Sequence, residues 1–145
     1  MMGTLLVNSV LASVLFDSGS SHSFVSEAFA LKQGLPFEHM YSPLVVSSPG
    51  SKWSTSMIAH NNRLEIGGLV FTASLMDLKV STIDVILGMD WLNAHDAHIH
   101  CGTKTVQLTH PSGQKILYSA RTAQHAEAQI YALNALNAYI WASAC

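Results

Sequence analysis

The segment VLFDSGSSHSF, residues 14–24, places one ionisable residue, Asp17, at the end of an apolar run. Burying a lone carboxylate is costly unless other groups compensate for its charge. A glycine two residues later lets the backbone turn close to the carboxylate, so that a backbone N–H can donate a hydrogen bond to it. Asp17, Ser18 and Gly19 are therefore the candidate catalytic residues. The alternative is a plain loop that begins where a strand ends.

A carboxylate of this kind can activate water when a second carboxylate shares a proton with it. Two carboxyl groups about 3 Å apart cannot both ionise, so one acts as the base and the other as the acid. Asp-Ser/Thr-Gly occurs once in the sequence, at residues 17–19. A chain of 145 residues is the length of one domain and is too short for two lobes with an aspartate each. We therefore expect a symmetric homodimer to supply the second carboxylate.

Two other clusters carry reactive side chains. In HDAHIHC, residues 95–101, His98 and His100 would share one face of a strand while Cys101 points to the other face, so four metal ligands would not meet. In SSHSF, Ser21 stands beside His22, but the Gly-x-Ser-x-Gly turn is absent, and neighbours in sequence rarely adopt the geometry of a triad. We expect no metal site and no cofactor.

The composition indicates which classes of binding partner to expect. Charged residues make up only 11% of the chain, against roughly 25% in typical soluble domains. A surface with few charges favours association with another copy of the chain. The seven basic residues stand singly, so we expect no nucleic-acid partner. The sequence has no signal-peptide pattern and no apolar run that could cross a bilayer, so we expect no membrane contact and a cytoplasmic location.

Turn residues divide the sequence into short strands. Three hairpins are predicted, with strands over residues 4–7 and 10–16, 43–48 and 52–58, and 64–66 and 70–75. An apolar strand over residues 84–87 ends at Gly88, and further strands are expected over residues 99–101, 105–109 and 115–118. Many short strands at this spacing predict a closed or sandwiched β architecture.

Helices are expected at three places. Ser26 can cap a short helix that ends at Gly34, and residues 89–94 follow Gly88 as a second short helix. We expect Asp90 to cap that second helix rather than to take part in chemistry. Residues 120–142 are rich in alanine and contain no glycine or proline, which predicts a C-terminal helix.

Two motifs together make the sequence recognisable. LFDSGSSHSFVS, residues 15–26, and DVILGMDWL, residues 84–92, resemble the retroviral-type aspartic proteases of the Ty3/gypsy long-terminal-repeat retrotransposons. The resemblance covers about residues 3–118. It implies an all-β, retropepsin-like closed barrel (the acid protease fold) with one lobe per chain and short helices. We therefore predict a protease domain over residues 1–119 and a helical extension or linker over residues 120–145.

The resemblance also implies roles for individual residues. Asp17 would be the catalytic aspartate, Ser18 would hydrogen-bond across the dimer axis, and Gly19 would orient the carboxylate. An apolar strand that ends in Ile-Leu-Gly would pass beside this loop. The serine of the triplet differs from the threonine that retroviral enzymes usually carry.

The hairpin across Pro49 and Gly50 has the position of the flap that closes over substrate in that family. A peptide would lie extended and pair its main chain with the flap and the cleft. The predicted substrate-binding residues are Ser20, Pro49, Gly50, Trp53 and Ile86. Trp53 would wall a subsite, and simple cross-strand packing is the alternative for its side chain.

The function implied by the resemblance is that of a homodimeric aspartic endopeptidase. Its substrate would be a Gag-Pol-type polyprotein of a retrotransposon, cleaved in the cytoplasm, including within virus-like particles. The alternative is a retroelement remnant or a domesticated copy that keeps the fold as a dimeric peptide-binding module without catalysis.

Overall fold

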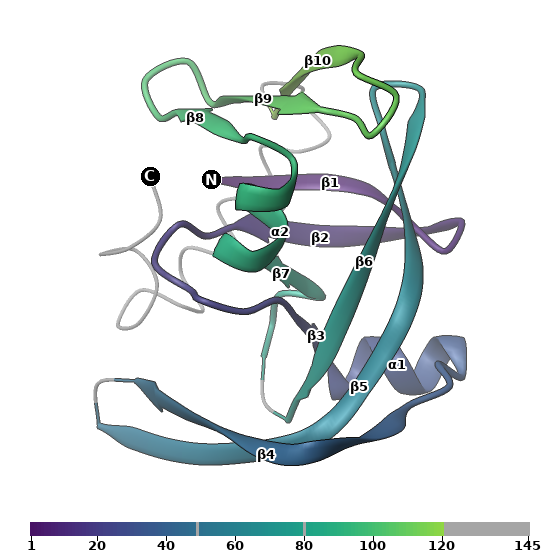
Figure 1. The fold of residues 1–145 in the computed structure, drawn as a ribbon, viewed down its shortest axis with the longest axis vertical. Helices are drawn as coiled ribbons and strands as arrows, with labels where there is room; N and C mark the ends of the chain where they lie inside the picture. The colour runs from purple at the N-terminus through teal and green to yellow at the C-terminus, as the bar shows by residue number, and fades with distance from the viewer. Residues whose placement is uncertain (49, 80, 121–145) are drawn as a thin grey trace.

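The computed structural model describes residues 1–48, 50–79 and 81–120 (Figure 1). These residues contain ten strands and two short helices. Along the chain these elements are β1 (Met2–Val7), β2 (Val10–Phe16), β3 (Phe24–Ser26), α1 (Glu27–Gln33), β4 (Glu38–Ser48), β5 (Ser51–Ile66), β6 (Leu69–Leu78), β7 (Val85–Leu87), α2 (Met89–Ala94), β8 (His98–His100), β9 (Thr105–Thr109) and β10 (Lys115–Ser119). The C-terminal helix predicted over residues 120–142 lies outside the described residues, apart from Ala120.

Six of the described strands close into a barrel. The order around it is β1, β2, β7, β3, β6 and β5. β5 pairs back with β1, where Leu6 lies opposite Glu65 and Val7 opposite Leu64, and this pairing closes the ring. β4 extends the sheet beyond β5, and β8, β9 and β10 form a separate small sheet at the other end of the molecule (Figure 1). The closed all-β barrel confirms the predicted fold class.

The turn residues explain the hairpins. Asn8 and Ser9 both have positive φ, as do Gly67 and Gly68, and this backbone conformation suits the two-residue turns that match the twist of a hairpin. The structure extends several of the predicted strands. The strands predicted over residues 52–58 and 64–66 belong to the single long strand β5, and the strand predicted over residues 43–48 begins at Glu38 as β4. A register shift between Ala59 and Asn62 lets β5 bend and continue.

The two helices have the predicted limits. The Ser26 side chain accepts a hydrogen bond from the Phe29 backbone N–H at 3.2 Å, and Gly34 ends α1 with a left-handed φ of 62°. The short strand β3 was not predicted, because three residues are too few to show an alternating pattern. It forms because β6 and β7 lie on either side of it and pair with its backbone. Among the described residues no helix has the length and apolarity needed to cross a membrane.

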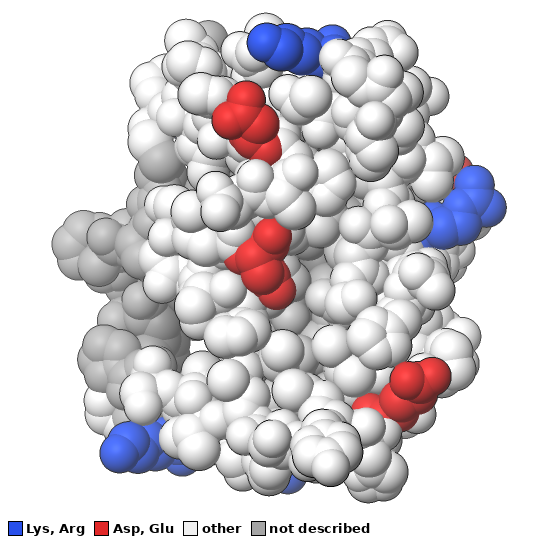
Figure 2. Space-filling view, in the orientation of Figure 1, with Lys and Arg blue, Asp and Glu red and all other residues white. Residues whose placement is uncertain are grey.

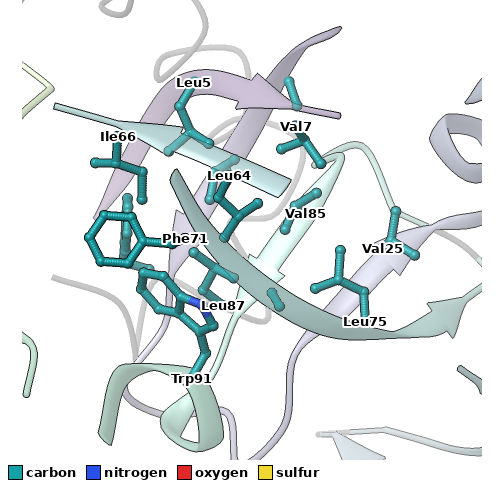
Figure 3. Close-up of a cluster of buried hydrophobic side chains, with 14 of the residues drawn as sticks. Leu5, Val7, Val25, Leu64, Ile66, Phe71, Leu75, Val85, Leu87 and Trp91 are labelled. Carbon is teal, nitrogen blue, oxygen red and sulfur yellow. The ribbon is translucent and has the colours of Figure 1, made fainter. Parts of the chain in front are cut away.

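The main core fills the barrel (Figure 3). Alternate residues of the strands point inward, as Leu5 and Val7 of β1 do, and each fully buried aliphatic or aromatic side chain contributes about 1.5–3 kcal/mol. Trp91 of α2 joins this core and donates its indole N–H to the Thr72 carbonyl at 3.0 Å. On the face drawn in Figure 2 the charged side chains are few and scattered.

Tyr118 fastens the small sheet to the barrel. Its hydroxyl donates a hydrogen bond to the Thr4 carbonyl at 3.0 Å, and its ring packs on Phe16 with the centroids 5.7 Å apart. Burial raises the pKa of Tyr118 from 10.0 to about 12. The neutral phenol is therefore the form that the folded chain favours.

We expect Tyr118→Phe to lower the free energy of unfolding by about 1 kcal/mol below pH 10, because one hydrogen bond to a backbone carbonyl is lost. The raised pKa means that this advantage of the wild type is complete below the unfolded pKa of about 10 and declines as the pH rises toward 12. Urea unfolding of both proteins across this range measures the difference. A difference in unfolding free energy that stays constant through pH 12 would contradict the raised pKa of Tyr118.

Candidate active site

Asp17 lies directly after the last residue of β2, and only 5% of its surface is exposed. Its backbone N–H donates to the Leu87 carbonyl at 2.9 Å. The Gly19 backbone N–H donates to Oδ1 of the carboxylate, also at 2.9 Å. The carboxylate is therefore held at the common end of β2 and β7 by the backbone around it.

β2 and β7 run parallel and bring together the two motifs of the sequence. Leu15 lies opposite Ile86, and Phe16 opposite Leu87. The register is fixed at the start of the pairing, where the Ser13 N–H donates to Asp84 Oδ2 at 2.9 Å and the Asp84 N–H donates to Ser13 Oγ at 3.0 Å. The Ile-Leu-Gly strand thus passes beside the Asp-Ser-Gly loop.

The loop after Gly19 is tied to α2. The Ser23 hydroxyl donates to Asp90 Oδ1 at 2.6 Å and accepts from the Gly88 N–H at 3.0 Å, and the Met89 N–H donates to the Ser20 carbonyl at 2.7 Å. The N-cap of α2 is Gly88, so the expectation that Asp90 caps this helix is corrected. The Asp90 carboxylate instead joins the helix to the loop, and it also accepts from the Trp91 N–H at 2.7 Å.

Ser18 and Gly19 are exposed beside the buried Asp17. Ser18 borders a hollow of about 230 Å³ whose other walls come from α2, β8 and the turn between them. The residues that line it with Ser18 are Met89, Leu92, Asn93, Asp96, Ala97 and Ile99. The Asp-Ser-Gly loop therefore opens onto a surface that is formed mainly by α2 and its continuation.

An apolar row starts next to Asp17 and crosses three strands. Leu15 lies opposite Ile86, and Ile86 lies opposite Phe24. Residues two apart on a strand point to the same side, so Leu15 and Asp17 face the same way. We call Leu15, Ile86 and Phe24 the floor row, and all three belong to a second apolar cluster, separate from the barrel core.

The hairpin of β4 and β5 forms a long arm at the edge of the molecule (Figure 1). Leu44, Val46 and Trp53 point to its inner face and pack against the second cluster, which contains the floor row. The neighbouring Val45 points outward and is 63% exposed. Gly50 at the tip has a φ of 80°, and Pro49 lies outside the described residues.

The remaining predicted substrate-binding residues divide into two groups. Ile86 belongs to the second apolar cluster and Trp53 packs against it, where the Trp53 ring meets Phe24 edge-on with the centroids 5.7 Å apart. The Ser20 hydroxyl is bound within its own loop, because it donates to the His22 carbonyl at 2.8 Å. Phe24 was missed by sequence reasoning, and its only signal was an apolar residue that follows the serine-rich loop.

The histidines of HDAHIHC lie in two different environments. His98 and His100 are exposed, and His98 lies 3.5 Å from the Asp96 carboxylate. His95 is buried, with Nδ1 2.8 Å from the Trp91 carbonyl. In the described ranges, no group of three or more histidine, cysteine, aspartate or glutamate side chains has the arrangement needed to hold a metal ion.

Comparisons with known proteins identify the fold. The sequence model of a family described as retroviral aspartyl protease matches residues 1–114, whereas no curated protein sequence matches significantly. One similar solved structure is the retroviral protease-like domain of Ddi1 from Leishmania major, with 15% identity and a TM-score of 0.62, covering 82% of this chain and 91% of that one. Another is the EIAV protease complexed with the inhibitor HBY-793, with 18% identity and a TM-score of 0.52, covering 65% of this chain and 86% of that one. At these identities the likeness demonstrates the fold alone.

Gly88 offers a test of how tightly the loop and α2 are joined. A Cβ at this position would overlap the His22 carbonyl and lie 2.7 Å from the Ser20 carbonyl, and both are backbone atoms that cannot turn away. We expect Gly88→Ala to lower the free energy of unfolding by about 1–3 kcal/mol. Gly102→Ala is the matched control, because nothing lies within 4 Å of its Cβ. Equal thermal or urea stability of the two variants would contradict the packing described here.

Proposed function

Because the chain belongs to the retroviral aspartyl protease family, we propose that it is an aspartic endopeptidase that acts as a homodimer, with one Asp17 from each copy in a shared site. The observation that carries the proposal is the buried Asp17 carboxylate, which accepts the Gly19 N–H at the end of β2 and adjoins an apolar floor. Such a carboxylate is positioned by backbone hydrogen bonds before substrate arrives.

A second copy is the natural source of the second carboxylate. The other described aspartates close to the loop have partners of their own, since Asp84 accepts from the Ser13 backbone and Asp90 from Ser23 and Trp91. Asp96, which lines the hollow with Ser18, lies 3.5 Å from Nε2 of His98. Ser18 and the hollow between it and α2 form an exposed surface beside Asp17. We infer that the partner packs against this surface, which brings the two loops together at the symmetry axis.

The pair of Asp17 carboxyl groups would share one proton. The ionised carboxylate takes a proton from a water molecule, and the water oxygen forms a bond to the peptide carbonyl carbon. The protonated carboxyl group donates its proton to the carbonyl oxygen. When the resulting tetrahedral intermediate collapses, one of its hydroxyl groups returns its proton to the pair, the C–N bond breaks, and the amine leaves with the proton that the pair took from water. The hairpin of β4 and β5, which we call the flap hairpin, would cover the site and exclude bulk water.

The substrate we propose is a Gag-Pol-type polyprotein of a Ty3/gypsy retrotransposon. The support is sequence resemblance in the motifs around Asp17 and Gly88. The polypeptide would lie extended between the inner face of the flap hairpin and the floor row, with its backbone pairing as an added strand. A non-catalytic module of the same fold would bind such a peptide in the same way but would not cleave it.

We expect Asp17→Asn to lower cleavage of an unfolded protein such as casein by at least about 10²-fold, because an amide cannot accept or donate the shared proton. Glu38→Gln is the matched control, since its side chain is 71% exposed and lies on β4. Mass spectrometry at mildly acidic pH measures cleavage, and circular dichroism verifies the fold. Normal turnover by Asp17→Asn would exclude Asp17 as the catalytic residue. A wild type that binds peptide without cutting it would favour the non-catalytic module.

We also expect activity per mole to fall on dilution, because each chain supplies half of the site. Met89 is 40% exposed and lines the hollow, so Met89→Glu should raise the concentration at half-maximal specific activity by about 10-fold or more, since it brings two charges into the interface. Leu31→Glu on α1 is the control, because Leu31 is 73% exposed and does not line the hollow. Sedimentation velocity gives the mass in parallel. Equal effects of the two variants would place the dimer contact elsewhere.

A further inference from the structure

The contact between Phe24 and Trp53 joins the two parts of the molecule between which a peptide would lie. Phe24 belongs to the floor row and is buried, and Trp53 stands on the inner face of the flap hairpin, opposite Val46. Their rings meet at an interplanar angle of 63° with the centroids 5.7 Å apart. An edge-on aromatic pair at this distance is a favourable and directional contact.

The position of the pair relative to Asp17 follows from the sheet. β7 lies between β2 and β3, and neighbouring strands are about 4.8 Å apart, so Phe24 lies on the order of 10 Å from the strand that ends at Asp17. An extended peptide advances about 3.3 Å per residue. The pair would therefore face a substrate side chain a few residues from the scissile bond rather than one that flanks it.

The space at this position is already largely filled. Met76 and Ile83 are buried in the same apolar cluster as Phe24, and Leu44 and Val46 pack against that cluster beside Trp53. A large side chain of the substrate could enter only by displacing the indole from Phe24. A small side chain could pass beside the pair and leave the contact intact.

We propose that Trp53 determines specificity, because its contact with Phe24 restricts one position of the substrate to small side chains such as glycine, alanine and serine. The inference rests on the proposed function, since it concerns the same cleft. Removing the indole should open this position to large apolar side chains. A size difference of one or more methylene groups in an apolar pocket is worth about 10- to 200-fold in kcat/KM.

The test uses a library of peptides from a digested proteome, with cleavage sites read by mass spectrometry. The wild type should exclude large residues at one position, and Trp53→Ala should raise the relative kcat/KM for leucine or phenylalanine there by about 10-fold or more. The profile at the other positions should stay unchanged. Trp53→Phe, which keeps an aromatic ring, should retain most of the restriction. Val45→Ala is the control on the outer face of the same hairpin.

Binding of uncut peptides provides a second readout. The same library is captured on Asp17→Asn protein, with and without Trp53→Ala, so the size preference is measured without turnover. Absence of cleavage by a folded wild type would overturn the proposed function, while the captured peptides would still decide the size restriction. An unchanged size profile after Trp53→Ala, in a protein with a native circular dichroism spectrum, would overturn the role of Trp53. If Trp53→Ala fails to fold, Trp53→Leu takes its place: a profile relaxed toward large side chains at that position supports the role of Trp53, and a profile identical to the wild type overturns it.

Discussion

A carboxylate that is almost fully buried needs hydrogen-bond donors, and the parallel pairing of β2 with β7 brings the backbone of two distant segments around Asp17. The pairing is set by the exchange of hydrogen bonds between Ser13 and Asp84 and ends where the Asp17 N–H meets the Leu87 carbonyl. From that point the chain turns sharply enough for the Gly19 N–H to reach the carboxylate. A shift of one residue in this register would move Asp17 to the other face of the sheet.

The same pairing positions the rest of the site. Gly88 ends the Ile-Leu-Gly segment directly under the loop, and its lack of a side chain allows the backbone at Ser20 and His22 to cross it closely. α2 begins there, is joined to the loop by the Ser23–Asp90 hydrogen bond, and forms the surface next to Ser18. The floor row continues from β2 through β7 to β3. The carboxylate, the proposed dimer surface and the proposed substrate cleft are therefore built from one set of strand contacts.

The sequence alone predicted those features of the fold that depend on neighbouring residues in the chain. Positive-φ residues at Asn8–Ser9 and Gly67–Gly68 marked two turns, and Gly88 separated a strand from a helix. The sequence did not predict features that depend on contacts between residues far apart in the chain. The strand β3 exists because β6 and β7 flank it, and β5 continues through a bulge that tertiary pairing stabilises. In the site, the Asp-Ser-Gly motif located Asp17, but the Ser23–Asp90 bond joins residues 67 positions apart and leaves no local signal.

The central claim is that two chains share one catalytic site, and the stoichiometry of a tight inhibitor tests it most directly. A peptide that carries a hydroxyl group in place of the scissile bond mimics the tetrahedral intermediate and should bind far more tightly than a matched substrate. Titration calorimetry at a chain concentration well above that needed for association counts the bound molecules. The account predicts saturation at one inhibitor per two chains. Saturation at one inhibitor per chain would contradict it.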